Sequence, residues 1–580
     1  MKKLFTATFL TAMVVLFTLP TRSFAQSDTL VVYANDTKTI DQVIGGDTLS
    51  DGAQAHSVYK LVSVDTTYLL DATITLKSGV TIVGVPGPNG QLPCIQADVL
   101  SGGSIPGVFF TLTGAGTRVS LDNLYLLGIA PNNLNNTASG QGVQVSADNI
   151  SLSVNNCVFD NMSQFEIGYS ANGDNFYITN SDFRNGIDVA SAYYVPELLR
   201  SENGAGAWNT DTIDIKYNTM IGVAMGPVET TGLTTYMNFS HNDVLLTSKG
   251  PFWSEREVNL VFDDNIFYDT YAVGENKTEY NGGWDELAPP RTPSVFYLDT
   301  LDSTTAAHLL GHAITSASDY AAAEAARKIE VKDNDCFWSS GLTSFWKAWD
   351  DTAHTDSLYT PVFMNSQTMA MFGNAAYPNL VQSGNQSLDP GFGASVNDVL
   401  SPGSDTTDGV GLLNWVADVR TGNGSTQFYA YQRTEVPQPE PNNWMPTWPL
   451  PEASALKYSN ATLQSASTDG LPVGDPYWFN GVTAVKQQPV VVPEKFDLSQ
   501  NYPNPFNPTT DIKVSLRKAG VISLDVYNVL GQLVKVVDEG YKPAGEYVYN
   551  VNMDSFASGV YFYTLRQGAS SITRKMLLLK

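Results

Sequence analysis

The sequence has little cysteine and little positive charge. Only 3 of its 580 residues are Cys, which excludes a scaffold built on disulfide bonds. Lys and Arg total 32 against 58 Asp and Glu, a net charge of −26. This balance argues against nucleic acid as a partner, because phosphates require clustered basic side chains. Beyond the N-terminus no apolar run is long enough to cross a bilayer, so we expect no transmembrane segment in the mature chain.

The residues that are plentiful indicate an all-β protein. Hydrophobic residues make up 43%, which is enough for a buried core and excludes global disorder. Charged residues make up only 16%, while there are 47 Gly, 28 Tyr and 26 Phe. This composition is typical of strands joined by many turns and is unlike that of a helical bundle.

The N-terminus reads as a secretory signal peptide. Lys2 and Lys3 precede an apolar stretch from Leu4 to Leu19, and Ser23-Phe24-Ala25 places small residues at the −3 and −1 positions. We expect cleavage after Ala25. A retained membrane anchor is disfavoured, because the apolar stretch is short and is broken by Pro20.

The C-terminal region predicts a small β-sandwich. From Phe496 onward apolar residues alternate along several short segments, such as Ile512, Val514 and Leu516, which is the pattern of strands with one buried face. Prolines and Ala-Gly or Ser-Gly pairs separate these segments and mark turns. About seven short strands in such a length predict an immunoglobulin-like fold.

Four stretches in this region, NYPNPFNPTT, VYNVLGQLV, SGVYFY and RKMLLLK, closely resemble the type A C-terminal sorting domain of the type IX secretion system, a family of Bacteroidetes and neighbouring phyla. The resemblance covers residues 496–580. It implies that the type IX machinery is a partner, and that the protein crosses the inner and then the outer membrane. It also implies release or surface attachment after the domain is removed, hence an extracellular or outer cell-surface location. An ordinary immunoglobulin-like module is the alternative.

The charge is concentrated between the two ends. The signal peptide carries +3, residues 495–580 hold 10 basic and 7 acidic residues, and the part between them is therefore left with −32. So acidic a surface favours solubility outside the cell and does not attract a polyanion. Pectin and alginate are consequently poor candidates as ligands.

The middle of the chain contains a repeat in which two alternating apolar residues are followed by polar ones and another apolar residue. The copies align on Leu121, Val154, Ile178, Ile215, Phe239, Phe262 and Val331. Five residues later each copy is apolar again, at Leu126, Phe159, Phe183, Met220, Val244, Phe267 and Cys336. The intervals are 33, 24, 37, 24, 23 and 69, and 69 is three times 23.

A basic period of 23–24 residues predicts the coils of a right-handed parallel β-helix with longer excursions. Equivalent strands then pair along the axis, so we expect the aligned Phe side chains to be buried. The polar corner positions Asn123, Asn156, Asn180 and Asp264 predict a hydrogen-bonded ladder, because Asn tolerates bent backbone. Leucine-rich and β-propeller repeats compete, but neither leucine spacing nor a Trp-Asp signature recurs at this period.

Two further stretches resemble parts of known β-helix proteins. Residues 76–84 (LKSGVTIVG) resemble the opening coil of pectate-lyase-like proteins. Residues 469–478 (DGLPVGDPYW) resemble a closing segment of secreted Bacteroidetes β-helix proteins that usually ends in GDPRW, with Tyr477 here in place of the Arg. An Ala-rich stretch, residues 306–328, predicts helix, and we expect helix there only.

We therefore divide the chain into five parts. They are a signal peptide (1–25), an N-terminal cap (26–75), a parallel β-helix with loop insertions (76–415), a Pro- and Trp-rich closing segment with linker (416–494) and the sorting domain (495–580).

Polygalacturonase-like chemistry finds only partial support. The chain has Asn209-Thr210-Asp211 and the pair Asp263-Asp264, and paired carboxylates can act as acid and base across a glycosidic bond. The two sites lie about two coils apart, however, and the Gly-His-Gly and Arg-Ile-Lys motifs of that family are absent. We favour the interpretation of Asp263 and Asp264 as corner residues.

Pectate-lyase-like chemistry is the second catalytic hypothesis. It requires carboxylates that hold calcium and a basic residue that removes a proton. Lys216 and Asp263 occupy equivalent outward positions two coils apart, roughly 10 Å, and Arg256 lies on the approach to the same coil. The candidate bases are therefore Lys216 and Arg256, with Asp263 and Asp264 as candidate calcium ligands; scattered surface charges are the alternative. The Trp-Ile-Asp-His signature of the main pectate lyase family is missing.

Aromatic side chains offer a binding site without catalysis. Trp338, Trp346 and Trp349 follow the last aligned coil and could stack on sugar rings, or could instead cover an open side of the coil. Two hypotheses survive: a secreted protein that binds an extracellular polysaccharide, and a polysaccharide lyase or glycoside hydrolase. The missing catalytic signatures favour the first.

Overall fold

The computed structural model describes residues 28–34, 37–99, 104–129, 140–186, 197–202, 208–223, 225–250, 252–253, 256–274, 293–351, 358, 360–393, 413, 416–417, 420, 448, 450, 456–480, 495–517, 520–542, 545–568 and 570–580. The predicted signal peptide, 1–25, lies outside these residues. So does most of the Pro- and Trp-rich stretch between 416 and 455.

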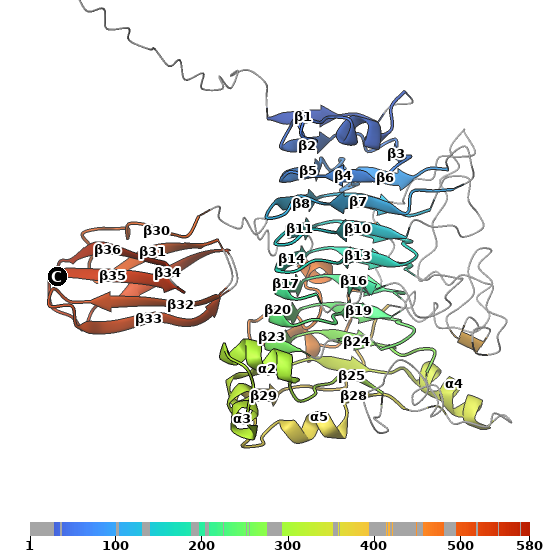
Figure 1. Ribbon diagram of the computed structural model, residues 1–580. Coiled ribbons are helices and arrows are strands. Elements are labelled where there is room, and N and C mark those ends of the chain that lie inside the picture. Colours follow the sequence, from blue (N-terminus) through green and yellow to red (C-terminus); the bar gives the residue numbers. More distant parts are fainter. Residues whose placement is uncertain are drawn as a thin grey trace, which may run out of the picture.

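Most of the chain winds into a parallel β-helix with three sheets (Figure 1). The first sheet has eleven strands: β1 (Thr29–Val32), β2 (Val58–Leu61), β5 (Val80–Gly84), β8 (Arg118–Asp122), β11 (Ser151–Asn155), β14 (Asp174–Thr179), β17 (Thr210–Lys216), β20 (Thr234–Ser240), β23 (Glu257–Asp263), β26 (Lys328–Lys332) and β29 (Leu380–Ser383). Because β1 and β2 pair in this sheet, its strands begin within residues 26–75, the region interpreted as a cap.

Two further parallel sheets complete each coil. The second sheet contains β3 (Tyr68–Leu70), β6 (Cys94–Ala97), β9 (Tyr125–Leu127), β12 (Val158–Asp160), β15 (Asp182–Arg184), β18 (Thr219–Ile221), β21 (Asp243–Leu245), β24 (Ile266–Tyr268) and β27 (Asp335–Phe337). The third contains β4 (Ile74–Leu76), β7 (Val108–Leu112), β10 (Gln141–Val145), β13 (Phe165–Tyr169), β16 (Glu197–Ser201), β19 (Gly226–Glu229) and β22 (Phe252–Trp253).

The strand register confirms the repeat residue by residue. Leu121 pairs with Val154, and the pairing continues through every aligned position to Phe262 with Val331. The positions five residues later pair in the same way in the second sheet, from Leu126 with Phe159 to Phe267 with Cys336. The five aligned Phe side chains are fully buried, and rings on successive coils stack, as Phe239 does on Phe262 at 5.3 Å.

The interval of 69 residues is one coil with an insertion. Val331 pairs directly with Phe262, so no further coil of the first sheet lies between them. The insertion contains β25 (Ser294–Phe296), which pairs with β28 (Val362–Met364), and the helices α2 (Ser303–Leu310) and α3 (Ala317–Ala326). These helices confirm the prediction for the Ala-rich stretch.

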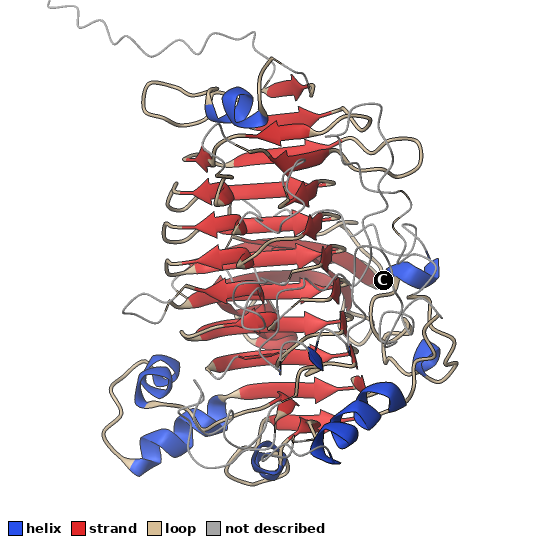
Figure 2. Cartoon of the chain, turned by 90° about the vertical axis from the view of Figure 1, so that its right-hand side faces the viewer, coloured by secondary structure: helices blue, strands red, loops and turns tan. Residues whose placement is uncertain are grey.

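Helix is nevertheless not confined to that stretch. The structure also contains α4 (Ser340–Asp351), α5 (Ser366–Met371), short α9 (Tyr477–Asn480) and the single turns η1 (Asp41–Gly45) and η2 (Leu463–Ser465). Helices gather at the end of the coil that carries β26 to β29 (Figure 2). In the described part of the chain no helix has the length and apolar character needed to span a membrane.

A two-residue corner joins seven successive strands of the first sheet, from β8 to β26, to the second sheet. Its first residue has a left-handed backbone, with φ between 49° and 59°, at Asn123, Asn156, Asn180, Tyr217, His241, Asp264 and Asp333. This confirms the expectation that the corner backbone is bent. Five of these seven are Asn or Asp, the non-glycine residue types that adopt a left-handed backbone at the lowest cost.

The hydrogen-bonded ladder lies one residue further along the chain than predicted. Asn218, Asn242, Asn265, Asn334 and Asn385 form a column in which each amide nitrogen donates to the next amide oxygen at 2.9–3.0 Å. Each oxygen also accepts the backbone N–H of the Asn before it, at 3.0–3.2 Å. Along the predicted column, Asn156 donates to Asn123 at 2.7 Å, whereas Asn180 donates to Asn155 instead.

The C-terminal region is an antiparallel sandwich of the immunoglobulin-like kind, as predicted. One sheet contains β30 (Asp497–Leu498), β31 (Thr509–Leu516) and β34 (Gly545–Asn552). The other contains β33 (Leu533–Lys542), β32 (Gly520–Tyr527), β35 (Gly559–Gln567) and β36 (Ser570–Leu578). The alternating residues Ile512, Val514 and Leu516 are fully buried between the sheets.

The asparagine column makes a prediction about stability. Replacing Asn265 by Ala should lower the free energy of unfolding by about 2–5 kcal/mol, because Asn242 would lose its acceptor and each buried unsatisfied group costs about 1–3 kcal/mol. Urea unfolding followed by circular dichroism measures the change. The matched control is Asn89→Ala, an exposed position, which should change stability by less than about 0.5 kcal/mol. Equal stability of the two variants would contradict the role assigned to the column.

Candidate functional site

The structure places Lys216 on the outward face of the first sheet. It pairs in register with Ser240, and Ser240 pairs with Asp263, so Lys216 and Asp263 lie two strands apart as expected. The Lys216 Nζ lies 3.2 Å from Asp214 Oδ2. Its charge is therefore already balanced by a carboxylate on its own strand.

Arg256 is not brought to the same place. It precedes the first residue of β23, whereas Asp263 is the last residue of that strand. Its Nε lies 3.1 Å from Asp302 Oδ2, and its Nη1 donates to the Thr231 carbonyl at 2.9 Å. The guanidinium thus connects the coil to the start of α2, at the opposite end of β23 from the predicted calcium ligands.

Asp263 and Asp264 are adjacent but differently placed. Asp263 ends β23, and burial raises its pKa to about 6, against the lowering effect of Lys332. Asp264 occupies the left-handed corner, where burial and then the charge of Asp263 raise its pKa to about 7. Both carboxyl groups are therefore less exposed to water than surface ligands of calcium would be.

The three predicted binding tryptophans lie against the coil near α4. Trp338 donates its indole N–H to the Thr270 carbonyl at 2.9 Å. Trp346 is only 4% exposed and donates to the Ala272 carbonyl at 3.2 Å. Trp349 is half-buried, with the Arg420 guanidinium 5.4 Å from its ring centre. Trp346 therefore presents no free ring face in this structure.

A segment near the end of the β-helix region docks on the corner between the first and second sheets. This 467–478 segment contains the whole DGLPVGDPYW run. Its Gly474 N–H donates to the Asp264 carbonyl at 2.7 Å. Gly474 has φ 82°, and a Cβ there would lie 2.1 Å from Asp243 Oδ1, so only glycine permits this approach.

The next residues of the segment attach to the second sheet. Thr219 Oγ1 donates to Asp475 Oδ2 at 3.0 Å and accepts the indole N–H of Trp478 at 2.8 Å. Asp475 Oδ1 accepts the N–H of Tyr477 at 3.0 Å. Burial raises the pKa of Asp475 to about 7, although both hydrogen bonds act to lower it.

A pocket of about 300 Å³ opens beside these contacts, and we call it the Asp475 pocket. Its lining comes from the loop before β6, from the second sheet with its corner, and from the 467–478 segment together with Trp448 and Leu450. The lining residues are Pro86, Asn89, Gly90, Leu92, Asn156, Cys157, Val158, Asn180, Ser181, Asp182, Thr219, Trp448, Leu450, Asp475, Tyr477 and Trp478. The volume is at the lower end of the range for ligand sites, about 300–1,000 Å³.

The pocket combines aromatic rings with carboxyl and amide groups. Trp448 packs edge-on to Tyr125 at 6.2 Å, and Trp478 packs edge-on to Tyr477 at 4.9 Å. Asp182 and Asp475 add carboxyl groups, and Asn156 and Asn180 add amides from the corner. Rings that pack on the apolar face of a sugar, beside groups that bind its hydroxyls, are what a carbohydrate site requires.

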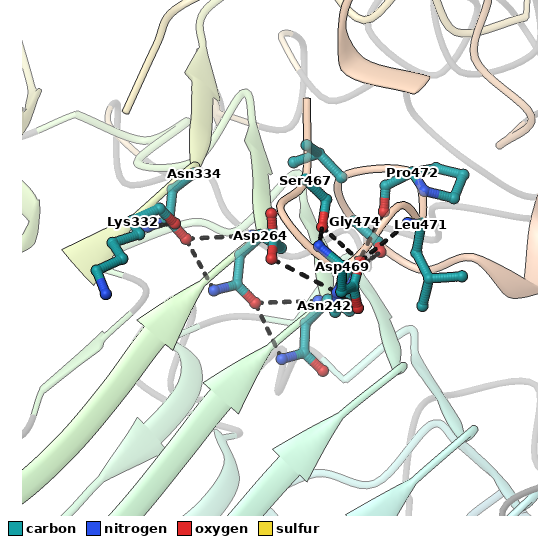
Figure 3. Close-up of polar contacts among 12 residues, drawn as sticks. Asn242, Asp264, Lys332, Asn334, Ser467, Asp469, Leu471, Pro472 and Gly474 are labelled. Atoms are coloured by element: carbon teal, nitrogen blue, oxygen red, sulfur yellow. Dashed lines mark hydrogen bonds and ion pairs between the residues drawn. The ribbon is translucent and has the colours of Figure 1, made fainter. Parts of the chain in front are cut away.

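A second cluster lies at the same corner, where Asp264 of the coil approaches Asp469 of the 467–478 segment (Figure 3). His241 Nε2 lies 3.0 Å from Asp469 Oδ2 and 3.6 Å from Asp264 Oδ2. His241 Nδ1 lies 3.1 Å from the Pro472 carbonyl and 3.3 Å from the Gly474 carbonyl. The ring of Tyr217 stacks on the imidazole at 5.4 Å.

Sequence reasoning missed most of these residues. The run DGLPVGDPYW contains Asp469, Asp475 and Trp478, and it was the available signal. His241 stands in the aligned repeat at a corner position, but its partner Asp469 lies 228 residues later. No periodic pattern connects two such positions.

Comparison with protein-family models matches residues 500–579 to the secretion system C-terminal sorting domain. This match confirms the resemblance of the C-terminal region and indicates a protein that is exported by the type IX system. Comparisons with curated proteins and with solved structures found no match to the chain.

Proposed function

We propose that the protein is a secreted or cell-surface β-helix protein that binds an extracellular polysaccharide in the Asp475 pocket. The observation that carries this proposal is the grouping of Trp448, Tyr477 and Trp478 around buried carboxyl groups and half-buried amide groups. A pocket of this volume accommodates a single sugar unit or a chain end better than a long stretch of polymer.

The charge of the protein indicates the class of polysaccharide. Residues between the signal peptide and the sorting domain carry −32, and the pocket itself contributes Asp182 and Asp475. A polyuronate would be repelled by this surface, whereas a neutral glycan would not. We therefore expect a neutral glycan whose affinity varies little with salt concentration.

A polysaccharide lyase or hydrolase is the second candidate function. The observation in its favour is the register that stacks Lys216, Ser240 and Asp263 on the outward face of the first sheet. In that case Lys216 would act as the base and Asp263 would lie near calcium. The ion pair of Lys216 with Asp214 and the distant position of Arg256 weigh against this alternative.

The export route defines the mature chain. We propose that the signal peptide is removed after Ala25 and the sorting domain near Phe496, so that the secreted protein contains the β-helix and the 467–478 segment. The intact mass of protein from the culture medium checks both ends. Retention of residues 500–579 on the secreted form would refute the second cleavage.

Binding should depend on Trp448. Protein from the medium is applied to an array of neutral and uronate glycans, and the best ligand is then titrated by calorimetry. Trp448→Ala should weaken binding by about 1–3 kcal/mol, roughly 5- to 150-fold, because a ring in the pocket wall is lost. The matched control is Trp349→Ala, a half-buried ring on α4 outside the pocket, which should bind like the wild type.

Two results of this experiment would contradict the proposal. One is normal binding by Trp448→Ala with loss in Trp349→Ala, which would move the site to α4. The other is a rise in absorbance at 235 nm with a polyuronate that Lys216→Ala abolishes, which would establish the lyase alternative.

A further inference from the structure

Three side chains from distant parts of the chain converge at the corner of the coil. Each of His241, Asp264 and Asp469 offers a ligand atom, and these atoms lie within 4.8 Å of one another. His241 and Asp264 are each 4% exposed, and the Asp469 side chain is 44% exposed. The cluster is therefore buried on the side of the coil and open to solvent on the side of Asp469.

The hydrogen bonds of His241 fix which nitrogen faces the carboxylates. Nδ1 lies near two backbone carbonyls, Pro472 O and Gly474 O, which can only accept, so Nδ1 carries the hydrogen. In the neutral ring Nε2 then directs its lone pair at Asp264 and Asp469. A lone pair that faces two carboxylates is repelled unless a cation or a proton lies between them.

A second observation also indicates a missing partner. Oδ1 of Asp264 is buried and accepts no hydrogen bond from the described residues. The nearby Ser467 hydroxyl donates to Asp469 Oδ1 at 2.6 Å. The Asp264 carboxyl group thus has one oxygen, Oδ2, near His241 and a second, Oδ1, that accepts no hydrogen bond from the described residues. A buried carboxyl oxygen without a hydrogen-bond donor is rare.

We propose that His241, Asp264 and Asp469 bind a divalent transition metal ion of the Zn²⁺ class. One imidazole nitrogen with two carboxylates is a donor set that suits zinc. Ligands about 2.0 Å from a tetrahedral ion lie about 3.3 Å apart, and the two Nε2 to oxygen distances, 3.0 and 3.6 Å, bracket this value. A ligating His usually donates its other nitrogen to a backbone carbonyl, as His241 does.

This site differs from the calcium site that the sequence predicted. Calcium takes six to eight oxygen ligands and disfavours imidazole, whereas this cluster offers one nitrogen and two carboxylates. Asp264 belongs to the cluster, but Asp263 does not belong to any such group among the described residues. The exposed face of Asp469 leaves room for water as a fourth ligand.

The ion would attach the 467–478 segment to the β-helix. Asp469 comes from the segment, whereas His241 and Asp264 come from successive corners of the coil. Six residues after Asp469, Asp475 forms part of the pocket wall. If the proposed glycan function holds, the ion therefore also supports that wall.

The test is a titration of the chelator-treated, full-length chain with ZnCl₂ by calorimetry, with CaCl₂ in a parallel run. We expect one zinc per chain and no calcium at this site, and we expect zinc to raise the melting temperature. Asp469→Asn should weaken zinc binding at least 10-fold and remove the thermal shift. His241→Asn should abolish both effects.

The matched control is His312→Asn, an exposed His between α2 and α3, which should bind zinc like the wild type. Asp469 is partly exposed, so its Asn variant tests the proposal even if His241→Asn fails to fold. Absence of stoichiometric zinc binding, or wild-type affinity in Asp469→Asn, would overturn the proposal. The titration contains no glycan, so its failure is distinguishable from failure of the proposed function.

Discussion

The structure depends on the hydrogen-bonded corner between the first and second sheets. Successive coils are joined by parallel strand pairing, and at this corner the column from Asn218 to Asn385 adds side-chain hydrogen bonds along the axis. Each Asn side chain also donates to a backbone carbonyl of the preceding coil, such as Asn265 to Phe239 O. Buried polar groups are thereby satisfied at a position where the backbone turns sharply.

The corner also explains where a functional site can form. Its left-handed residues project outward beside the inward Asn column, and their identity varies from coil to coil, from Asn123 to Tyr217, His241 and Asp264. The coil keeps these side chains at fixed spacing, so a later segment can bind to them. The 467–478 segment does so, and with Trp448 it forms the outer wall of the Asp475 pocket.

The repetitive part of the fold was predictable from the sequence, and the site was not. The repeat positions from Leu121 to Val331 pair as aligned, because inward positions must be apolar on every coil. The sequence predicted the asparagine ladder at the first residue of each corner, whereas it lies at the second. The two positions are easily confused, because Asn recurs at both of them. The 69-residue interval shows that arithmetic on spacings cannot separate extra coils from an insertion.

The site depends instead on contacts between single residues far apart in the chain. Thr219 and Asp475 lie 256 residues apart, and no periodic pattern connects the two positions. The Trp residues after β27 were visible as a group, but the indole N–H groups of Trp338 and Trp346 donate to backbone carbonyls of the coil. Burial of this kind follows from the path of α4, which periodicity does not determine.

The most direct test of this account is a crystal structure of the secreted chain with a bound oligosaccharide. We expect electron density for a sugar in the Asp475 pocket, with a ring against Trp448 and hydroxyls near Asp182 and Asp475. Density on the outward face of the first sheet, between Lys216 and Asp263, would contradict it.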